Sequence, residues 1–124
     1  MSPRSPRSEL LGFLGLAHRA GAVVRGTDEV RSALQKDGAL LVLMAGDASE
    51  TQTKKILRLL EVRGVPSAVL GSRSELGEAV GGPPLSAVAL TKPAFAESFL
   101  KKLQATAGAG LRPLTTEEDQ AHAG

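Results

Sequence analysis

The fold of this chain is decided by residues 39–70, whose sequence is ALLVLMAGDASETQTKKILRLLEVRGVPSAVL. Residues 39–45 are a continuous apolar run of strand length, which is typical of a strand buried on both faces of a sheet. Residues 67–70 form a second short run of strand length after Pro66. Because a helix is expected between the two runs, the segment predicts a strand–helix–strand unit with a crossover connection.

The intervening helix has its own start and stop signals. Ser49 is followed three residues later by Gln52, which is the spacing of a capping box. Gly64 follows Arg63, and glycine readily takes the left-handed conformation that ends many helices. We therefore expect a helix from Ser49 to about Arg63.

Helical and strand periods also alternate on both sides of this segment. Expected N-caps precede each further helix, and Ser72 with Glu75 forms a second capping box. The expected elements are a helix that Ser8 caps and Gly21 ends, a strand at 22–25, a helix that Thr27 or Asp28 caps and Gly38 ends, a helix from Ser72 to Gly81, a strand at 85–90, and a helix that Thr91 caps.

Strands that alternate with helices require a sheet covered on both faces. We predict an α/β fold, a three-layer α/β/α sandwich with a mixed, mostly buried four-stranded sheet in which residues 39–45 and 85–90 are interior strands. The predicted domain spans residues 9–103. Residues 1–8 are basic and polar, and residues 104–124 are polar and rich in Gly and Ala. Both segments are therefore expected to be disordered.

Composition excludes several classes of protein. The 124 residues include no Cys, which excludes disulfide scaffolds, zinc ribbons and cysteine nucleophiles. No Trp or Tyr is present, which excludes the usual aromatic platforms for single-stranded nucleic acids. The net charge of +2 is too small to indicate a nucleic-acid partner by itself. No apolar run approaches the roughly 18 residues of a membrane span, and no signal peptide is recognisable. We expect a cytoplasmic protein with no membrane partner.

Catalytic and cofactor motifs are lacking in the sequence. His18 and His122 are the two histidines, and His122 lies in the expected tail. A Ser–His–acid triad would therefore have to use His18, late in the first expected helix. Neither a P-loop nor a Gly-rich dinucleotide motif follows an expected strand. The sequence therefore predicts no catalytic residue, no metal site and no cofactor.

The most suggestive chemistry lies between the first expected strand and the second expected helix, at Arg25, Gly26, Thr27, Asp28 and Glu29. Glycine lets a ligand approach the backbone closely, free N–H groups follow it, and Arg25 adds a positive charge. The two carboxylates repel a bare phosphate but accept the N1–H and N2–H₂ donors of guanine. This mixture favours nucleic-acid bases flanked by phosphates. The alternative interpretation is a well-capped surface helix.

Several segments resemble a known family in their order and spacing. They are 14–21 (LGLAHRAG), 26–30 (GTDEV), 42–49 (VLMAGDAS), 53–55 (TKK), 64–66 (GVP) and 74–77 (SELG). Over about residues 10–103 the chain resembles the kink-turn-binding ribosomal protein superfamily typified by archaeal "L-seven-Ae", and especially its bacterial YlxQ-type branch. The resemblance implies the same α/β/α fold and RNA binding without catalysis. It also implies that the tip after the first strand meets tandem G·A pairs and that the loop before the last strand meets a flipped-out base.

Carried over to this chain, the resemblance implies two groups of RNA-binding residues. They are Arg25, Gly26, Thr27, Asp28, Glu29 and Arg31 near the tip, and Gly82, Pro83, Pro84 and Leu85 in the loop. Two features depart from the family's strongest binders. Those proteins have Asn-Glu followed by Lys three residues after the Glu, whereas this chain has Asp28-Glu29 and then Ser32, with Arg31 beside it. The Gly-Pro-Pro loop replaces the usual aliphatic and polar residues.

Two functions from different classes follow from these observations. The first is a non-catalytic protein that recognises a kink-turn or a related internal loop in structured RNA, with ribosomal RNA as a candidate partner and an association with the ribosome or translation. The second is a protein-interaction adaptor of the translation machinery with weak or lost RNA binding, whose candidate partners are ribosomal proteins or translation factors.

Overall fold

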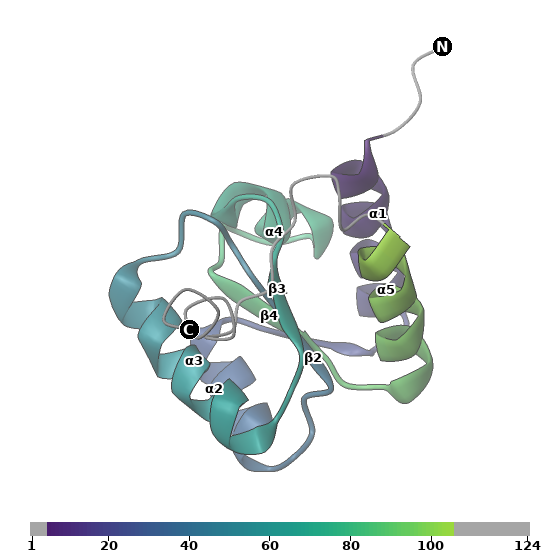
Figure 1. The fold of residues 1–124 in the computed structure, drawn as a ribbon. Helices are drawn as coiled ribbons and strands as arrows, with labels where there is room; N and C mark the ends of the chain where they lie inside the picture. The colour runs from purple at the N-terminus through teal and green to yellow at the C-terminus, as the bar shows by residue number, and fades with distance from the viewer. Residues whose placement is uncertain (1–4, 106–124) are drawn as a thin grey trace, which may run out of the picture.

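The computed structural model describes residues 5–105, in which helices and strands alternate (Figure 1). The helices are α1 (Pro6–Arg19), α2 (Thr27–Gln35), α3 (Glu50–Arg63), α4 (Arg73–Ala79) and α5 (Pro93–Ala105). The strands are β1 (Val23–Arg25), β2 (Leu41–Met44), β3 (Ser67–Val69) and β4 (Ala87–Leu90).

The four strands form one mixed sheet in the order β1-β4-β2-β3. Strands β2 and β3 are parallel, with Val42 opposite Ser67, whereas β4 is antiparallel to both of its neighbours, β1 and β2. The interior strands are therefore β2 and β4, and every residue of both is buried. The predicted α/β fold, its mixed four-stranded sheet and its two interior strands are confirmed.

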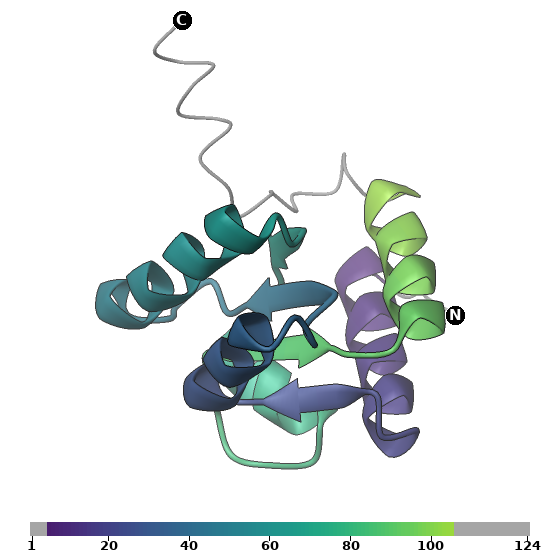
Figure 2. The same cartoon turned by 90° about the horizontal axis from the view of Figure 1, so that it is seen from below.

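Alternate residues of β2 face two separate cores. Leu41 and Leu43 belong to a core shared with α1, α4 and α5, whereas Val42 and Met44 belong to a core shared with α2 and α3. Figure 2 shows α1 and α5 on one side of the sheet and α2 and α3 on the other. This period of two, with both faces covered by helices, is why the β2 sequence is continuously apolar.

The capping signals of α3 and α4 are confirmed. The Ser49 Oγ accepts a hydrogen bond from the Gln52 backbone N–H at 3.1 Å, and Gly64 ends α3 in the left-handed conformation. Ser72 and Glu75 form the complete reciprocal capping box of α4, with donor–acceptor distances of 3.1 and 2.9 Å.

The expected starts of three other helices are wrong. Helix α1 begins at Pro6 and is capped by Ser5, whose Oγ accepts from the N–H of Ser8. Its first turn is polar and exposed, so no apolar periodicity marks it. Gly26 occupies the N-cap position of α2 without a side-chain cap. At α5, the Lys92 carbonyl accepts the N–H of Ala96, which moves the cap one residue beyond Thr91.

The predicted limits of the domain also change. Residues 5–8 belong to α1 and its cap, and α5 includes residues 104 and 105, so the expectation of disorder is wrong at these positions. Residues 1–4 and 106–124, on which the rest of that expectation falls, lie outside the described residues. The last strand begins at Ala87 rather than at Leu85, because the Leu85 N–H donates to the Arg73 carbonyl instead of joining the sheet.

Candidate nucleic-acid interface

One edge of the sheet gathers the segments that the sequence singled out. Because β4 runs opposite to β1 and β2, and β2 is parallel to β3, the strands β1, β2 and β3 all end at the same edge. Helices α2, α3 and α4 follow these strands, so their N-termini lie at that edge, as does loop 81–86, which precedes β4. Such an edge, outside the carboxyl ends of parallel strands, is where open α/β sheets bind ligands.

A hollow at this edge, called here the edge hollow, has walls from four parts of the chain. Its lining residues are Arg25, Gly26, Thr27, Asp28, Glu29, Gln52, Arg73, Pro84, Leu85 and Ser86. The structure thus brings together the predicted tip, residues 25–29, and two of the predicted loop residues. The predicted residues Arg31, Gly82 and Pro83 do not line the edge hollow.

Gly26 has a backbone conformation that explains why glycine stands at the tip. Its φ of 94° and ψ of 153° are strained for any residue with a Cβ atom. Its N–H donates to the Ala87 carbonyl at 2.8 Å, which continues the β1–β4 pairing by one residue. A Cβ atom built on Gly26 has no neighbour within 4 Å in the described part of the chain, so the backbone there is open to close approach by a ligand.

The start of α2 offers both donors and acceptors. Among residues 5–105 no side chain caps this helix, so N–H groups of its first turn lack the usual side-chain acceptor there. Asp28 and Glu29 are exposed in the same turn, where the helix dipole favours carboxylates. A ligand that presents donors to these carboxylates and oxygen atoms to the N–H groups fits this arrangement.

Gln52 and Arg73 were not among the residues expected from the sequence. Gln52 is half-buried on α3, and its amide can donate and accept at once. Arg73 is exposed at the first position of α4. A signal for Arg73 was present, because Ser72 marks a helix start and a cation is electrostatically disfavoured there unless an anion approaches from outside. For Gln52 the capping spacing gave a structural explanation and no sign of a surface role.

Loop 81–86 is fixed to α4 by close backbone contacts. A Cβ atom built on the buried Gly77 would overlap the carbonyl of Pro83, so only glycine fits beneath the loop. The Gly82 N–H donates to the Gly77 carbonyl at 2.8 Å, and the Leu85 N–H donates to the Arg73 carbonyl at 3.1 Å. The Pro83 carbonyl lies against Gly77, and Pro84 and Leu85 line the edge hollow.

The two arginines of the predicted site differ in their surroundings. Arg25 is exposed on the whole, but its Nη1 donates to the Val80 carbonyl at 3.3 Å. Arg31 is half-buried on α2, and its Nε is buried without a hydrogen-bond partner in the described part of the chain. The structure thus gives Arg25 an intramolecular contact and leaves Arg31 outside the walls of the edge hollow.

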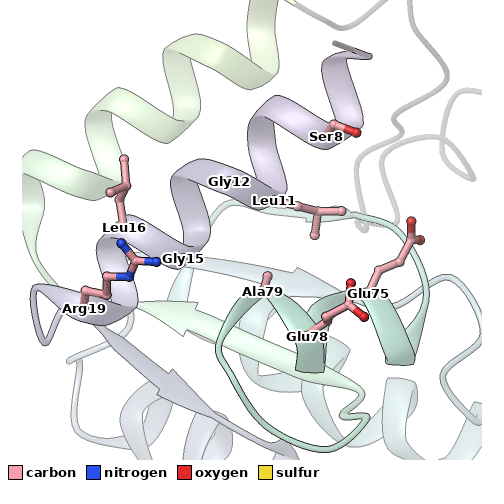
Figure 3. Close-up of a pocket in the computed structure, with 9 residues that line it drawn as sticks. All are labelled: Ser8, Leu11, Gly12, Gly15, Leu16, Arg19, Glu75, Glu78 and Ala79. Atoms are coloured by element: carbon pink, nitrogen blue, oxygen red, sulfur yellow. The ribbon is translucent and has the colours of Figure 1, made fainter.

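A second hollow lies between α1 and α4 (Figure 3). Its α1 side extends from Ser8 past Gly12 and Gly15 to Arg19, and its α4 side carries Glu75 and Glu78. Glu75 is already engaged in the α4 cap and in an ion pair with Arg7 at 3.4 Å. Two carboxylates on one wall make this hollow a poor site for the phosphates of a nucleic acid.

Over residues 5–105 the side chains form no group of three or more histidine, aspartate or glutamate residues suited to holding a metal ion. His18 lies in the last turn of α1, the position at which a histidine complements the helix dipole. His122 lies outside the described residues. None of the helices in this part of the chain combines the length and the apolar character needed to cross a bilayer.

The sequence matches the model of the ribosomal protein L7Ae/L30e/S12e/Gadd45 family over residues 8–100. The chain belongs to this family. All four parts of the chain that line the edge hollow fall within the matched region.

Individual relatives agree with this assignment. The chain is 36% identical over 95 residues to the "RNA-binding protein YlxQ" of Bacillus subtilis, an alignment that covers 77% of this chain and 95% of that protein. It is 32% identical over 80 residues to the "Large ribosomal subunit protein eL8" of Haloquadratum walsbyi, covering 64% of this chain and 67% of the relative.

Two solved structures have the same fold. A protein of unknown function from Bacillus halodurans C superposes with a TM-score of 0.72 at 28% identity, covering 77% of this chain and 96% of that one. The 15.5 kD RNA-binding protein of Giardia lamblia superposes with a TM-score of 0.67 at 24% identity, covering 85% and 92% of the two chains. The second likeness supports the fold alone.

Proposed function

We propose that this chain is a non-catalytic RNA-binding protein that recognises a kink-turn or a related internal loop at the edge hollow. The observation that carries the proposal is the convergence of the tip and loop 81–86, two segments more than fifty residues apart, on one hollow. Relatives named for RNA binding and for the large ribosomal subunit support this direction. The proposed setting is the ribosome or the translation machinery in the cytoplasm, with ribosomal RNA as the candidate partner.

The tip supplies the proposed recognition of bases. Asp28 and Glu29 are exposed acceptors at the mouth of the edge hollow, and a guanine edge carries two neighbouring N–H donors that match them. Open space above Gly26 lets the RNA backbone approach that of the protein.

Phosphate contacts have three proposed sources. N–H groups of the uncapped α2 N-terminus bind anions without adding charge. Arg73 adds a guanidinium from the α4 wall, where it can form a bidentate contact with a phosphate. Arg31 is the proposed additional cation on α2, two residues beyond the tip.

The loop wall offers an apolar surface to an unstacked base. Pro84 and Leu85 line the edge hollow, and neither side chain carries a hydrogen-bonding group. Contact with this wall therefore depends on shape and leaves the identity of the base to other contacts. Gly82 and Pro83 contribute by holding the loop on α4.

The test is a titration of the chain with a kink-turn RNA and with the same RNA after its G·A pairs are disrupted, at two salt concentrations. The proposal expects the kink-turn to bind more tightly, by at least about 2 kcal/mol, because each well-made base contact contributes about 1–3 kcal/mol of discrimination. Equal affinities that fall together with salt would show non-specific attraction only. In that case, a protein partner that co-purifies after ribonuclease treatment would favour the adaptor function instead.

A further inference from the structure

Arg25 connects two of the parts that line the edge hollow, the tip and loop 81–86. It is the last residue of β1 and the first residue of the tip. Its Nη1 donates to the carbonyl of Val80 at 3.3 Å, and Val80 is the C-cap residue of α4, where loop 81–86 begins. The same Nη1 would lie 3.2 Å from a Cβ atom built on Gly82. The guanidinium therefore rests against the start of the loop.

The electrostatics of α4 favour this contact. The carbonyl end of a helix carries a partial negative charge, which a basic residue in the last turn usually complements. Helix α4 has no basic residue in its last turn. Arg25 supplies the missing cation from β1, and a charge-assisted hydrogen bond results.

Three other hydrogen bonds of loop 81–86 join backbone groups and do not reach the tip. The bonds from Gly82 to Gly77 and from Leu85 to Arg73 tie the loop to α4, and the Ala45 N–H donates to the Ser86 carbonyl from the β2 side. None of these three bonds involves a side chain of the tip. The bond from Arg25 to Val80 is a side-chain link from the tip to the beginning of the loop.

We propose that Arg25 is a positioning residue that fixes the loop wall relative to the tip, and that it does not act as a phosphate contact. This inference rests on the proposed function for its consequence in RNA binding, but the positioning itself is a property of the free protein. A guanidinium held at the α4 C-terminus leaves the phosphate contacts to Arg73, to Arg31 and to the α2 N–H groups.

The first test uses the full chain without RNA. Hydrogen exchange is measured at the Gly82 and Leu85 amides in the wild type, in Arg25→Ala and in Arg58→Ala, which removes an exposed arginine of α3 outside the edge hollow. Arg25→Ala should speed exchange at both amides about three- to tenfold, as expected when a bond that restrains a local segment is lost. Arg58→Ala should leave both rates unchanged. Equal rates in Arg25→Ala and the wild type overturn the proposal.

The second test separates positioning from phosphate contact. Arg25→Ala should weaken kink-turn binding about three- to tenfold with an unchanged dependence on salt, whereas Arg73→Ala should make the salt slope shallower by about one phosphate contact. A slope that also becomes shallower in Arg25→Ala assigns Arg25 to the phosphates and overturns the proposal. If the wild type does not prefer the kink-turn, the proposed function fails and the exchange rates decide the role of Arg25 alone.

Discussion

Gly77 and Pro83 are in direct backbone contact, with no room for a methyl group between the α4 backbone and the Pro83 carbonyl. Gly77 also accepts the hydrogen bond of Gly82. These contacts hold loop 81–86 against α4, and Pro84 and Leu85 of the same loop line the edge hollow. The SELG segment of the sequence therefore has a structural reason for its final glycine.

Gly77→Ala should destabilise the protein by about 1–3 kcal/mol, because the added methyl group can be accommodated only if the backbone of the loop moves. Thermal unfolding should show a melting temperature lower by more than about 4 °C. Gly12→Ala is the matched control, since Gly12 is also helical but has nothing within 4 Å of its Cβ position. This control should stabilise the chain by about 0.5–1 kcal/mol through helix propensity. Equal effects of the two substitutions would contradict the packing argument.

Gly26→Ala tests the tip separately from the loop. The positive φ of 94° makes any Cβ strained, and we expect a loss of about 1–2 kcal/mol in the free energy of unfolding. Gly64→Ala is the control, because Gly64 also has a positive φ, of 66°, and an open Cβ position, but lies at the far end of α3. Both variants should lose stability in denaturant titrations. Gly26→Ala alone should also lose affinity for the kink-turn, and an unaffected affinity would show that the RNA does not approach the tip closely.

The layers of the fold could be predicted from the sequence because they follow from local periodicity. The alternation of Leu41 and Val42 between two cores produces the apolar run, and Ser49 and Ser72 mark helix starts through bonds to residues three positions away. The N-terminus of α1 was missed because its cap precedes an exposed polar turn. Strand order could not be predicted, since β4 is apolar on both faces and its sequence does not show that it lies between β1 and β2.

Only the part of the candidate site that is continuous in the sequence could be predicted. The tip is a continuous segment whose glycine and acids are visible together in the sequence. Gln52 and Arg73 reach the edge hollow only because three strands end at one edge, and that arrangement depends on long-range pairing. Pro83 was expected to face the RNA, but its contact with Gly77 depends on a packing detail that periodicity does not contain.

Gln52→Ala should separate binding from stability. The Gln52 side chain is half-buried in the wall of the edge hollow, and its backbone N–H, which bonds the Ser49 cap, is retained in alanine. We expect the free energy of unfolding to change by less than about 0.5 kcal/mol, while kink-turn affinity falls by about 1–3 kcal/mol if the amide contacts a base edge. Gln35→Ala, at the exposed far end of α2, is the control and should change neither quantity. Unchanged RNA binding in Gln52→Ala would remove α3 from the proposed interface.

Glu29→Ala tests base recognition most directly. If the Glu29 carboxylate accepts hydrogen bonds from a guanine edge, its removal should cost about 1–3 kcal/mol in affinity for the kink-turn. Binding to the G·A-disrupted RNA should stay the same or become slightly tighter, because a negative charge near the phosphates is lost. Glu97→Ala removes an exposed carboxylate from α5, on the other side of the sheet, and should leave the ratio of the two affinities unchanged. A capping role of Glu29 at the start of α2 would change only stability, by about 0.3–1 kcal/mol through the helix dipole. The affinities of Glu29→Ala for both RNAs are measured at two salt concentrations. If the variant still prefers the kink-turn over the G·A-disrupted RNA as strongly as the wild type does, the tip does not recognise the G·A pairs.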